Sequence, residues 1–224
     1  MLTDKDVRLL ESTLTFWSKL TIDEKDLIIN NVTPVNYHRG ETIHRGDSNC
    51  IGVMLIKTGS LRIYILSDEG KEITLYRLYA GDVCMLSASC LMKNITFDVH
   101  IDSEESSQVL LVNSSVFAKL IKQNIYVENF SYKTTVDRFS DVMWAMEQIL
   151  FMSFDRRMAT FLIDESAKNN SNTIMLTHDQ IAKYMGSARE VVSRMLKYFA
   201  NEGVVEMSRG GVKIIDKVKL RSFL

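Results

Sequence analysis

The stretch that decides the fold runs from Thr177 to Gly203 and reads THDQIAKYMGSAREVVSRMLKYFANEG. Thr177 stands three residues before Gln180, and Ser187 stands three residues before Glu190. A Ser/Thr-x-x-Glu/Gln pattern is typical of a capping box, in which side chains satisfy the free amide groups of a helix's first turn. We therefore expect two successive helices, joined by a short turn that contains a glycine.

The second of these helices separates apolar from polar residues. Apolar residues recur at helical spacing, and we expect them to pack in a core: Val191, Val192, Met195, Leu196 and Phe199. The polar residues fall elsewhere: Arg189, Glu190, Ser193, Arg194 and Lys197. Arg can donate two hydrogen bonds to guanine, and Glu can accept one from the amino group of cytosine. The pattern predicts a helix-turn-helix whose second helix enters the DNA major groove.

A hairpin is predicted directly after the second helix. Gly203 stands where a helix end needs a left-handed residue, and the segments 204–207, 208–211 and 212–215 read as strand, turn and strand. A plain helical hairpin with a solvated charged face is the alternative interpretation. It does not account for two capping boxes, an intervening glycine and a following hairpin occurring together, so we predict a DNA-binding winged helix.

The run IAKYMGSAREVVSR, residues 181–194, resembles the recognition-helix region of the cyclic-AMP receptor protein and FNR (Crp/Fnr) family of bacterial transcription regulators. The resemblance implies that Arg189, Glu190 and Arg194 contact bases, and that Thr177 and Ser193 contact the backbone or a neighbouring base. With Ser187 and Lys197, these residues form the predicted DNA-binding set.

Composition limits the class of protein. The chain has 224 residues, 46% hydrophobic and 25% charged, which is ordinary for a soluble globular protein with room for two modest domains. Its net charge of −1 argues against a wholly basic nucleic-acid binder. The charge is unevenly placed, however: residues 171–224 hold 9 Lys and Arg against 5 Asp and Glu, while residues 1–170 hold 18 against 23. The basic excess lies on the predicted DNA-binding region.

Targeting and cysteine signals are sparse. No basic start is followed by an apolar run, and no segment approaches the length that spans a bilayer, so we expect a cytoplasmic protein with no membrane partner. The three cysteines, Cys50, Cys84 and Cys90, form no C-x-x-C pair. This set argues against a disulfide framework and against a four-thiolate zinc site.

The N-terminal half is predicted to be a sandwich or jelly roll preceded by helix at 1–31. Short strands are expected, separated by Gly- and Asp-containing turns: Val35–Tyr37, Glu41–His44, Gly52–Lys57, Ser60–Leu66, Glu72–Leu78, Ile95–Ile101 and Val109–Asn113. Short strands separated by such turns at regular intervals are typical of jelly rolls.

The resemblance to the Crp/Fnr family extends over this half. Three turn motifs are similar to those of that family's cyclic-nucleotide-binding barrel: Gly40-Glu41-x-Ile43, Gly59-Ser60-Leu61 and Gly81-Asp82. The resemblance implies a small-molecule effector bound beside the segment that follows Gly81-Asp82. The implied contacts are Met85, Leu86, Ser87, Ala88, Ser89, Val142 and Met143.

The segment 83–94, VCMLSASCLMKN, departs from the cyclic-nucleotide pattern. The nucleotide-binding members have a Gly-Glu pair and, about ten residues on, an Arg; this segment has neither Glu nor Arg. Burying a phosphate without a partner costs several kcal/mol. Val142 and Met143 also fall roughly where those members carry hydroxyl groups. We therefore expect an effector other than cyclic AMP, and a less polar compound, a thiol-based signal or no ligand all remain open.

The cysteines and histidines raise two alternatives. Cys84 and Cys90 lie among apolar residues, where thiols are commonly buried and inert, but they leave open a redox-responsive regulator. FNR-like oxygen sensors hold a cluster with N-terminal cysteines, which this chain lacks. A cupin-like metal enzyme needs clustered ligands, usually His-x-His with a carboxylate, and His38, His44 and His100 form no such pair. We expect no metal, no cofactor and no enzyme activity.

One long helix is predicted at 121–152. Apolar residues recur at spacings of 4, 3, 4, 3 and 4, as in a coiled-coil seam: Tyr132, Val136, Phe139, Met143, Met146 and Leu150. A second stripe of Val142, Ala145 and Ile149 widens the apolar face. An ordinary core helix is the alternative, but the resemblance implies that this helix is a dimer interface.

The sequence thus predicts an α+β protein of three parts: a jelly-roll effector domain at 1–120, a dimerisation helix at 121–152, and a winged helix-turn-helix at 153–224 that starts at a Ser153 cap. It is expected to be a homodimeric transcription regulator on a two-fold symmetric double-stranded DNA site. A contact between the 168–173 loop and RNA polymerase, known in some family members, stays open.

Overall fold

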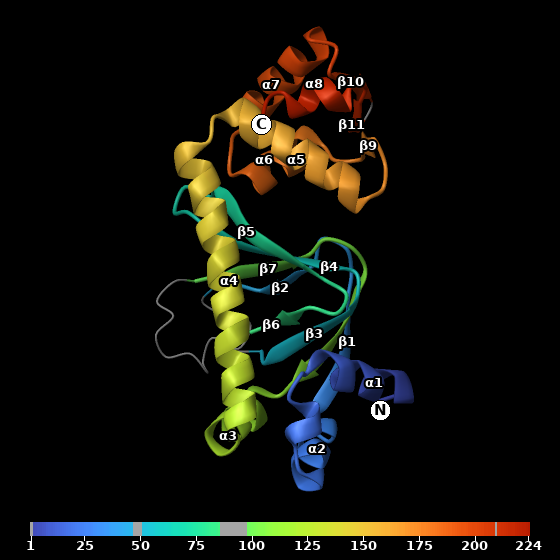
Figure 1. Cartoon of the computed structure of the whole chain (residues 1–224), viewed down its shortest axis with the longest axis vertical. Helices are drawn as coiled ribbons and strands as arrows, with labels where there is room; N and C mark the ends of the chain where they lie inside the picture. The colour runs from blue at the N-terminus through green and yellow to red at the C-terminus, as the bar shows by residue number, and fades with distance from the viewer. Residues whose placement is uncertain (1, 47–50, 86–97, 209) are drawn as a thin grey trace. The chain divides into compact units, whose positions relative to one another are not determined.

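The computed structural model describes residues 2–46, 51–85, 98–208 and 210–224 (Figure 1). The chain divides into two compact units. The first comprises Met1–Ile65 and Leu75–Val142, and the second comprises Leu66–Thr74 and Met143–Leu224.

Short helices open the first unit: α1 (Asp4–Thr13), a 3₁₀ turn (Trp17–Lys19) and α2 (Ile22–Ile29). Both α-helices begin at capping boxes, from Thr3 and from Thr21. Asp6 is buried and receives a hydrogen bond of 2.8 Å from Lys57 Nζ. Burial acts to raise the pKa of Asp6, but hydrogen bonds from Lys57 and Thr3 outweigh it and lower the pKa to about 2.

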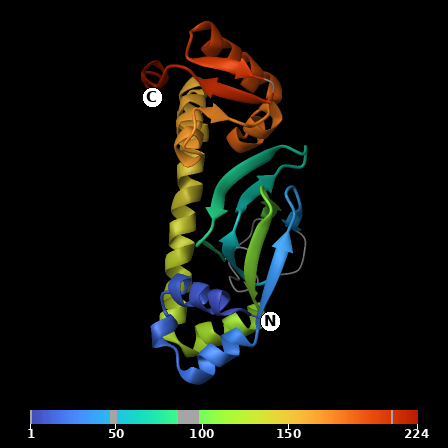
Figure 2. The ribbon, with the colours of Figure 1, turned by 90° about the vertical axis from the view of Figure 1, so that its right-hand side faces the viewer.

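Two antiparallel four-stranded sheets follow, in the orders β1-β8-β3-β6 and β2-β7-β4-β5. Figure 2 shows their strands from the side. Their strands are β1 (Val32–Tyr37), β2 (Thr42–His44), β3 (Val53–Thr58), β4 (Ser60–Leu66), β5 (Glu72–Tyr79), β6 (Val83–Cys84), β7 (His100–Ser103) and β8 (Ser107–Val112). This arrangement confirms the predicted jelly roll, although the short strand β6 was not predicted.

The strand β3 is apolar without alternation because both of its faces are covered. Val53 and Leu55 pack into the cluster that contains the N-terminal helices, whereas Met54 and Ile56 pack between the sheets. All four side chains are fully buried. A strand buried on both sides loses the alternation that marks a half-exposed one.

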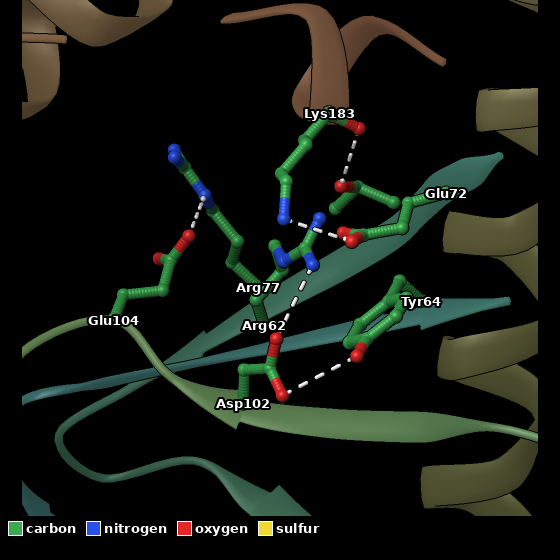
Figure 3. A network of polar contacts seen from close by, with 8 residues as sticks. Arg62, Tyr64, Glu72, Arg77, Asp102, Glu104 and Lys183 are labelled. Carbon is green, nitrogen blue, oxygen red and sulfur yellow. Dashed lines mark hydrogen bonds and ion pairs between the residues drawn. The ribbon is translucent and has the colours of Figure 1, made fainter. Parts of the chain in front are cut away.

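Polar side chains occupy the other face of β4 (Figure 3). Leu61 and Ile63 point into the core, and Arg62 and Tyr64 alternate with them. Arg62 Nη2 and Tyr64 Oη each donate to Asp102 of β7, at 3.3 Å. The Arg62 guanidinium lies 4.0 Å from the centre of the Tyr64 ring. These cross-strand contacts fasten β4 to β7.

Two helices complete the first unit, α3 (Ser114–Gln123) and α4 (Ile125–Phe151), which extends into the second unit. The prediction of one helix starting at Ile121 was wrong, because residues 121–123 belong to α3. Asn124 takes an extended conformation and ends α3. Its side-chain oxygen then accepts a hydrogen bond of 3.0 Å from the Tyr126 amide at the start of α4.

The second unit contains α5 (Phe154–Lys168), β9 (Thr173–Ile174), α6 (His178–Met185), α7 (Arg189–Asn201), β10 (Val205–Ser208), β11 (Gly211–Ile214) and α8 (Lys217–Arg221). Ser153 is the N-cap residue of α5, as predicted. The expected hairpin is present as β10 and β11, with β9 added at its edge in the order β10-β11-β9. One core of fully buried side chains joins these elements, including Met158, Leu196 and Phe199.

The segment Leu66–Thr74, which includes the end of β4, the following turn and the start of β5, belongs to this second unit. Lys183 Nζ of α6 lies 2.8 Å from Glu72 Oε1, and the Thr74 hydroxyl donates to the Lys183 carbonyl at 3.1 Å (Figure 3). No helix in the described part of the chain is long and apolar enough to cross a membrane.

Candidate nucleic-acid interface

The first helix of the motif begins and ends as its sequence indicates. Thr177 Oγ1 accepts from the Gln180 amide at 3.2 Å, and the Gln180 side chain accepts from the Thr177 amide at 2.9 Å. Gly186 ends α6 in the left-handed region, at a φ of +58°. Because Gly186 turns the chain there, α7 can start three residues later in a new direction.

The second predicted capping box was wrong. Ala188, not Ser187, is the N-cap residue of α7, and no side chain caps this helix. The Ser187 amide instead donates to the Ala182 carbonyl at 2.9 Å and so closes the end of α6. Ser187 therefore lies half-buried in the turn between the two helices.

The helix α7 has one face in the core and one in solvent. Val192, Leu196 and Phe199 are fully buried. The predicted base-contacting residues Arg189, Glu190 and Arg194 are exposed, as is Lys197. At about 100° per residue, the buried positions and these four occupy separate arcs of the helix. An exposed arc of donors and one acceptor, held on a packed helix, suits contact with base edges and phosphates.

The side chain of Arg189 has one charged neighbour in the motif. Arg189 Nε lies 3.7 Å from Asp179 Oδ2, and both side chains are mostly exposed. An exposed pair at this distance contributes little stability. Arg189 can therefore exchange Asp179 for a base or phosphate at low cost.

Ser193 is held from the neighbouring helix by a residue that the sequence did not single out. Its hydroxyl lies 2.7 Å from His178 Nδ1, in a partly buried position. The two residues are fifteen positions apart, so only the crossing of α6 and α7 brings them together. Thr177, the residue before His178, is exposed. Its hydroxyl donates to the Gln180 side chain within the capping box.

Comparisons with known proteins agree with this geometry. Residues 156–223 match the model of the Crp-like helix-turn-helix domain, and residues 34–124 match that of the cyclic nucleotide-binding domain. The crystal structure of a regulator assigned to the crp/fnr family from Eubacterium rectale is 42% identical, covers 95% of this chain and 99% of its own, and superposes with a TM-score of 0.92. The chain belongs to the Crp/Fnr family.

More distant curated relatives of this Crp/Fnr protein are also regulators. The transcriptional activator protein FnrA of Stutzerimonas stutzeri is 25% identical over 89% of this chain and 82% of its own. The cyclic AMP receptor protein of Thermus thermophilus is 23% identical over 90% and 92%. The prediction of a DNA-binding transcriptional regulator, rather than an enzyme, is confirmed by these relatives.

The helix α4 of this Crp/Fnr regulator carries an apolar stripe that the described residues leave uncovered. The six residues of the predicted seam are between 45% and 65% exposed: Tyr132, Val136, Phe139, Met143, Met146 and Leu150. By contrast, Val127 and Ser131 near the helix start are buried. Large apolar residues repeated on one exposed face are typical of an interface.

The predicted effector contacts are only partly described. Leu86, Ser87, Ala88 and Ser89 lie outside the described residues, as do Cys50 and Cys90. Met85 is buried in the cluster with the N-terminal helices, whereas Val142 packs against the core between the sheets. Met143 lies with the exposed stripe of α4. The structure therefore does not bring Met85, Val142 and Met143 into one cluster.

Four residues of the thiol and metal alternatives are described: Cys84, His38, His44 and His100. Cys84 is 1% exposed. His38 is exposed, His44 is buried, and His100 stacks on Tyr64 with 5.2 Å between ring centres. Among the described residues, no three His, Cys, Asp or Glu side chains are placed to hold a metal ion.

One polar cluster in the first unit was missed at the sequence level. Tyr76 of β5, Cys84 of β6 and Arg138 of α4 come together there, with Asp82 and Asp141 beside the guanidinium. Arg138 is the single basic residue in the middle of the apolar helix, between Lys133 and Arg156. This isolated position on α4 was the one sequence feature that could have indicated the cluster.

Proposed function

We propose that this Crp/Fnr protein is a homodimeric, sequence-specific regulator that binds a two-fold symmetric DNA site. The exposed polar arc of α7 is the observation that carries the proposal. Arg189, Glu190 and Arg194 would contact bases, while Lys197 and Thr177 would contact the backbone. Ser193 would contact DNA through the oxygen that His178 positions, and Ser187 would face the backbone from the turn.

The apolar stripe of α4 supports the homodimer. A second copy of α4 packed on this stripe would cover residues that are otherwise between 45% and 65% exposed. Two α7 helices about 34 Å apart would then enter successive major grooves. On this proposal the protein acts in the cytoplasm, with a sensor at 1–120, a dimerisation helix at 121–152 and a DNA-binding domain at 153–224. Whether it also contacts RNA polymerase is left to experiment.

The effector is proposed to be a compound other than cyclic AMP. One relative is named for cyclic AMP, but residues 83–94 of this chain offer neither the Glu nor the Arg that a ribose and a cyclic phosphate need. Val142, on the barrel side of α4, also has no hydroxyl to offer a base. An effector would act by binding more tightly to one arrangement of the dimer than to another.

A thiol switch through Cys84 and Cys90 is less well supported. Cys84 is 1% exposed, and the oxidation of a thiol depends on its exposure. Operator binding that is unchanged between peroxide and reductant would exclude this switch. A cupin-like enzyme is disfavoured because His38, His44 and His100 lie in different settings.

The test is DNA binding by an Arg189→Ala variant. An operator is first selected from random duplex DNA with the wild-type protein, and affinity is measured for that operator and for unrelated DNA. We expect the variant to lose about 1–3 kcal/mol on the operator and much less on unrelated DNA, because Arg189 reads a base. Arg221→Ala is the matched control, since it removes an exposed charge of the same unit outside α7. Equal losses on both DNAs would contradict the base-reading role.

A further inference from the structure

Two buried polar atoms in the first unit have no hydrogen-bond partner among the described residues: Tyr76 Oη and Arg138 Nε. They belong to neighbouring side chains, since the Arg138 guanidinium lies 5.3 Å from the centre of the Tyr76 ring. Tyr76 is 8% exposed. Most buried polar groups in proteins are hydrogen-bonded, and an unpaired one costs free energy. Two adjacent unpaired donors therefore call for an acceptor.

The charge of Arg138 is already balanced. Its Nη1 lies 2.8 Å from Asp141 Oδ2, and its Nη2 lies 3.6 Å from Asp82 Oδ1. One guanidinium thus faces two carboxylates, and the three groups together carry a formal charge of −1. Another anion would add repulsion in a partly buried place. The remaining Nε–H is a directional donor to an uncharged acceptor.

The phenol of Tyr76 is a second neutral donor. Burial raises the pKa of Tyr76 well above its ordinary value, and the nearby Cys84 adds to this effect. The hydroxyl therefore keeps its proton at neutral pH. The surroundings are apolar: Met54 and Cys84 are buried in the same cluster as Tyr76, and Val142 of α4 packs against it.

We propose that Tyr76 and Arg138 form the polar end of a binding site for a small, uncharged, largely apolar molecule that carries a carbonyl oxygen, such as an amide or a ketone. The inference rests on the proposed function, because it gives the chemical class of the effector and the residues that receive it. The carbonyl oxygen accepts from Tyr76 Oη and Arg138 Nε, and the apolar body packs beside Cys84 and Val142. Such a ligand joins β5 to α4, one residue before Phe139 of the apolar stripe.

Binding is tested on the full-length protein with named probes. Benzamide, acetanilide and cyclohexanone are the uncharged carbonyl compounds; benzoate and cyclic AMP are anions, and toluene lacks an acceptor. The readouts are the dissociation constant and the NMR signal of the Arg138 Nε–H group, assigned with the Arg138→Lys variant. We expect at least one carbonyl probe to bind more tightly than benzoate, cyclic AMP and toluene, and to shift this signal.

Two variants remove the donors singly. Tyr76→Phe removes only the hydroxyl, and Arg138→Lys keeps the charge but removes Nε–H. Each variant should raise the dissociation constant of the carbonyl probe about three- to tenfold, which corresponds to the loss of one hydrogen bond. Tyr64→Phe is the matched control, because this nearly buried tyrosine already donates to Asp102, and it should leave probe binding unchanged.

The results separate this inference from the proposed function. If no carbonyl probe binds, if an anion binds best, or if both variants bind the probe as well as the wild type, the inference is wrong. Operator binding by the same samples is measured in parallel. Retained operator binding then leaves the DNA-binding function standing, whereas its loss in the unaltered protein would overturn that function separately.

Discussion

Replacing Phe139 by alanine tests the proposed dimer interface on α4 quantitatively. The side chain is 63% exposed in the single chain, and an aromatic side chain buries about 150–250 Å². A partner copy could therefore cover about 120 Å² of it, equivalent to about 3 kcal/mol at 25 cal/mol per Å². The alanine that remains retains part of this area, which leaves a loss of about 2 kcal/mol.

The two-fold symmetry of the proposed dimer doubles this loss. Each copy contributes one Phe139, so Phe139→Ala removes about 4 kcal/mol per dimer and raises its dissociation constant about a thousandfold. Sedimentation velocity over a range of concentrations measures the dissociation constant, and circular dichroism checks that the variant stays folded. Operator binding should weaken in parallel, since a monomer presents one α7.

Trp144 provides the matched control on the same helix. It is 51% exposed, but it lies one residue after Met143 and so about 100° round the helix from the stripe. Trp144→Ala should leave the dissociation constant within a few-fold of the wild-type value. A dimer that tolerates Phe139→Ala, or that loses as much affinity from Trp144→Ala, would refute the assignment of this stripe.

Three further predictions concern stability. The pKa of Asp6 is lowered from 3.8 to about 2 in the folded protein. The ionised carboxylate therefore stabilises the fold above about pH 4, and this stabilisation is lost as the pH falls towards 2. Asp6→Asn should lower the free energy of unfolding, measured with urea, by about 1–2 kcal/mol at pH 7 and leave it unchanged near pH 2. Leu196→Ala removes a fully buried side chain and should lower the free energy of unfolding by about 2–5 kcal/mol, together with operator binding at 37 °C. Gly186→Ala places a Cβ at a φ of +58° and should lower the melting temperature by an amount equivalent to about 1–2 kcal/mol, whereas Gly→Ala at a helical φ would not.

The helix-turn-helix could be predicted from sequence because its signals are local. Thr177 and Gln180 are three residues apart, and Gly203 takes the left-handed conformation at φ +70° that its place after the helix requires. The box at Ser187 failed for a physical reason. The Ser187 amide is used to close α6, so the chain needs one more residue before α7 can begin at Arg189.

The barrel was predictable in outline but not in its shortest elements. Strands β6 and β9 have two residues each and exist through pairing with Met54–Leu55 and with Val212–Lys213. Two residues carry no periodicity of their own. The division at Asn124 was missed for a related reason, because apolar residues recur at helical spacing on both sides of it.

The Tyr76–Arg138 cluster was beyond reach because it depends on tertiary packing. Sixty-two positions separate the two residues, and neither stands in a recognisable motif. The sequence did indicate that the effector region lacks the charged pair of a nucleotide site. It could not show that α4 supplies an arginine already balanced by Asp82 and Asp141.

If both proposals hold, α4 carries the ligand contacts and the dimer interface on one helix. Arg138 and Val142 face the barrel, while Phe139 and Met143, each one residue later, lie in the exposed stripe. A ligand acts on an equilibrium only through the difference in its affinity for the two states. Two hydrogen bonds of about 1 kcal/mol each, made in one state and absent in the other, give a preference of about thirtyfold. In the proposed dimer, one bound ligand would then be enough to turn the ratio of the two states from about 1:5 into about 6:1.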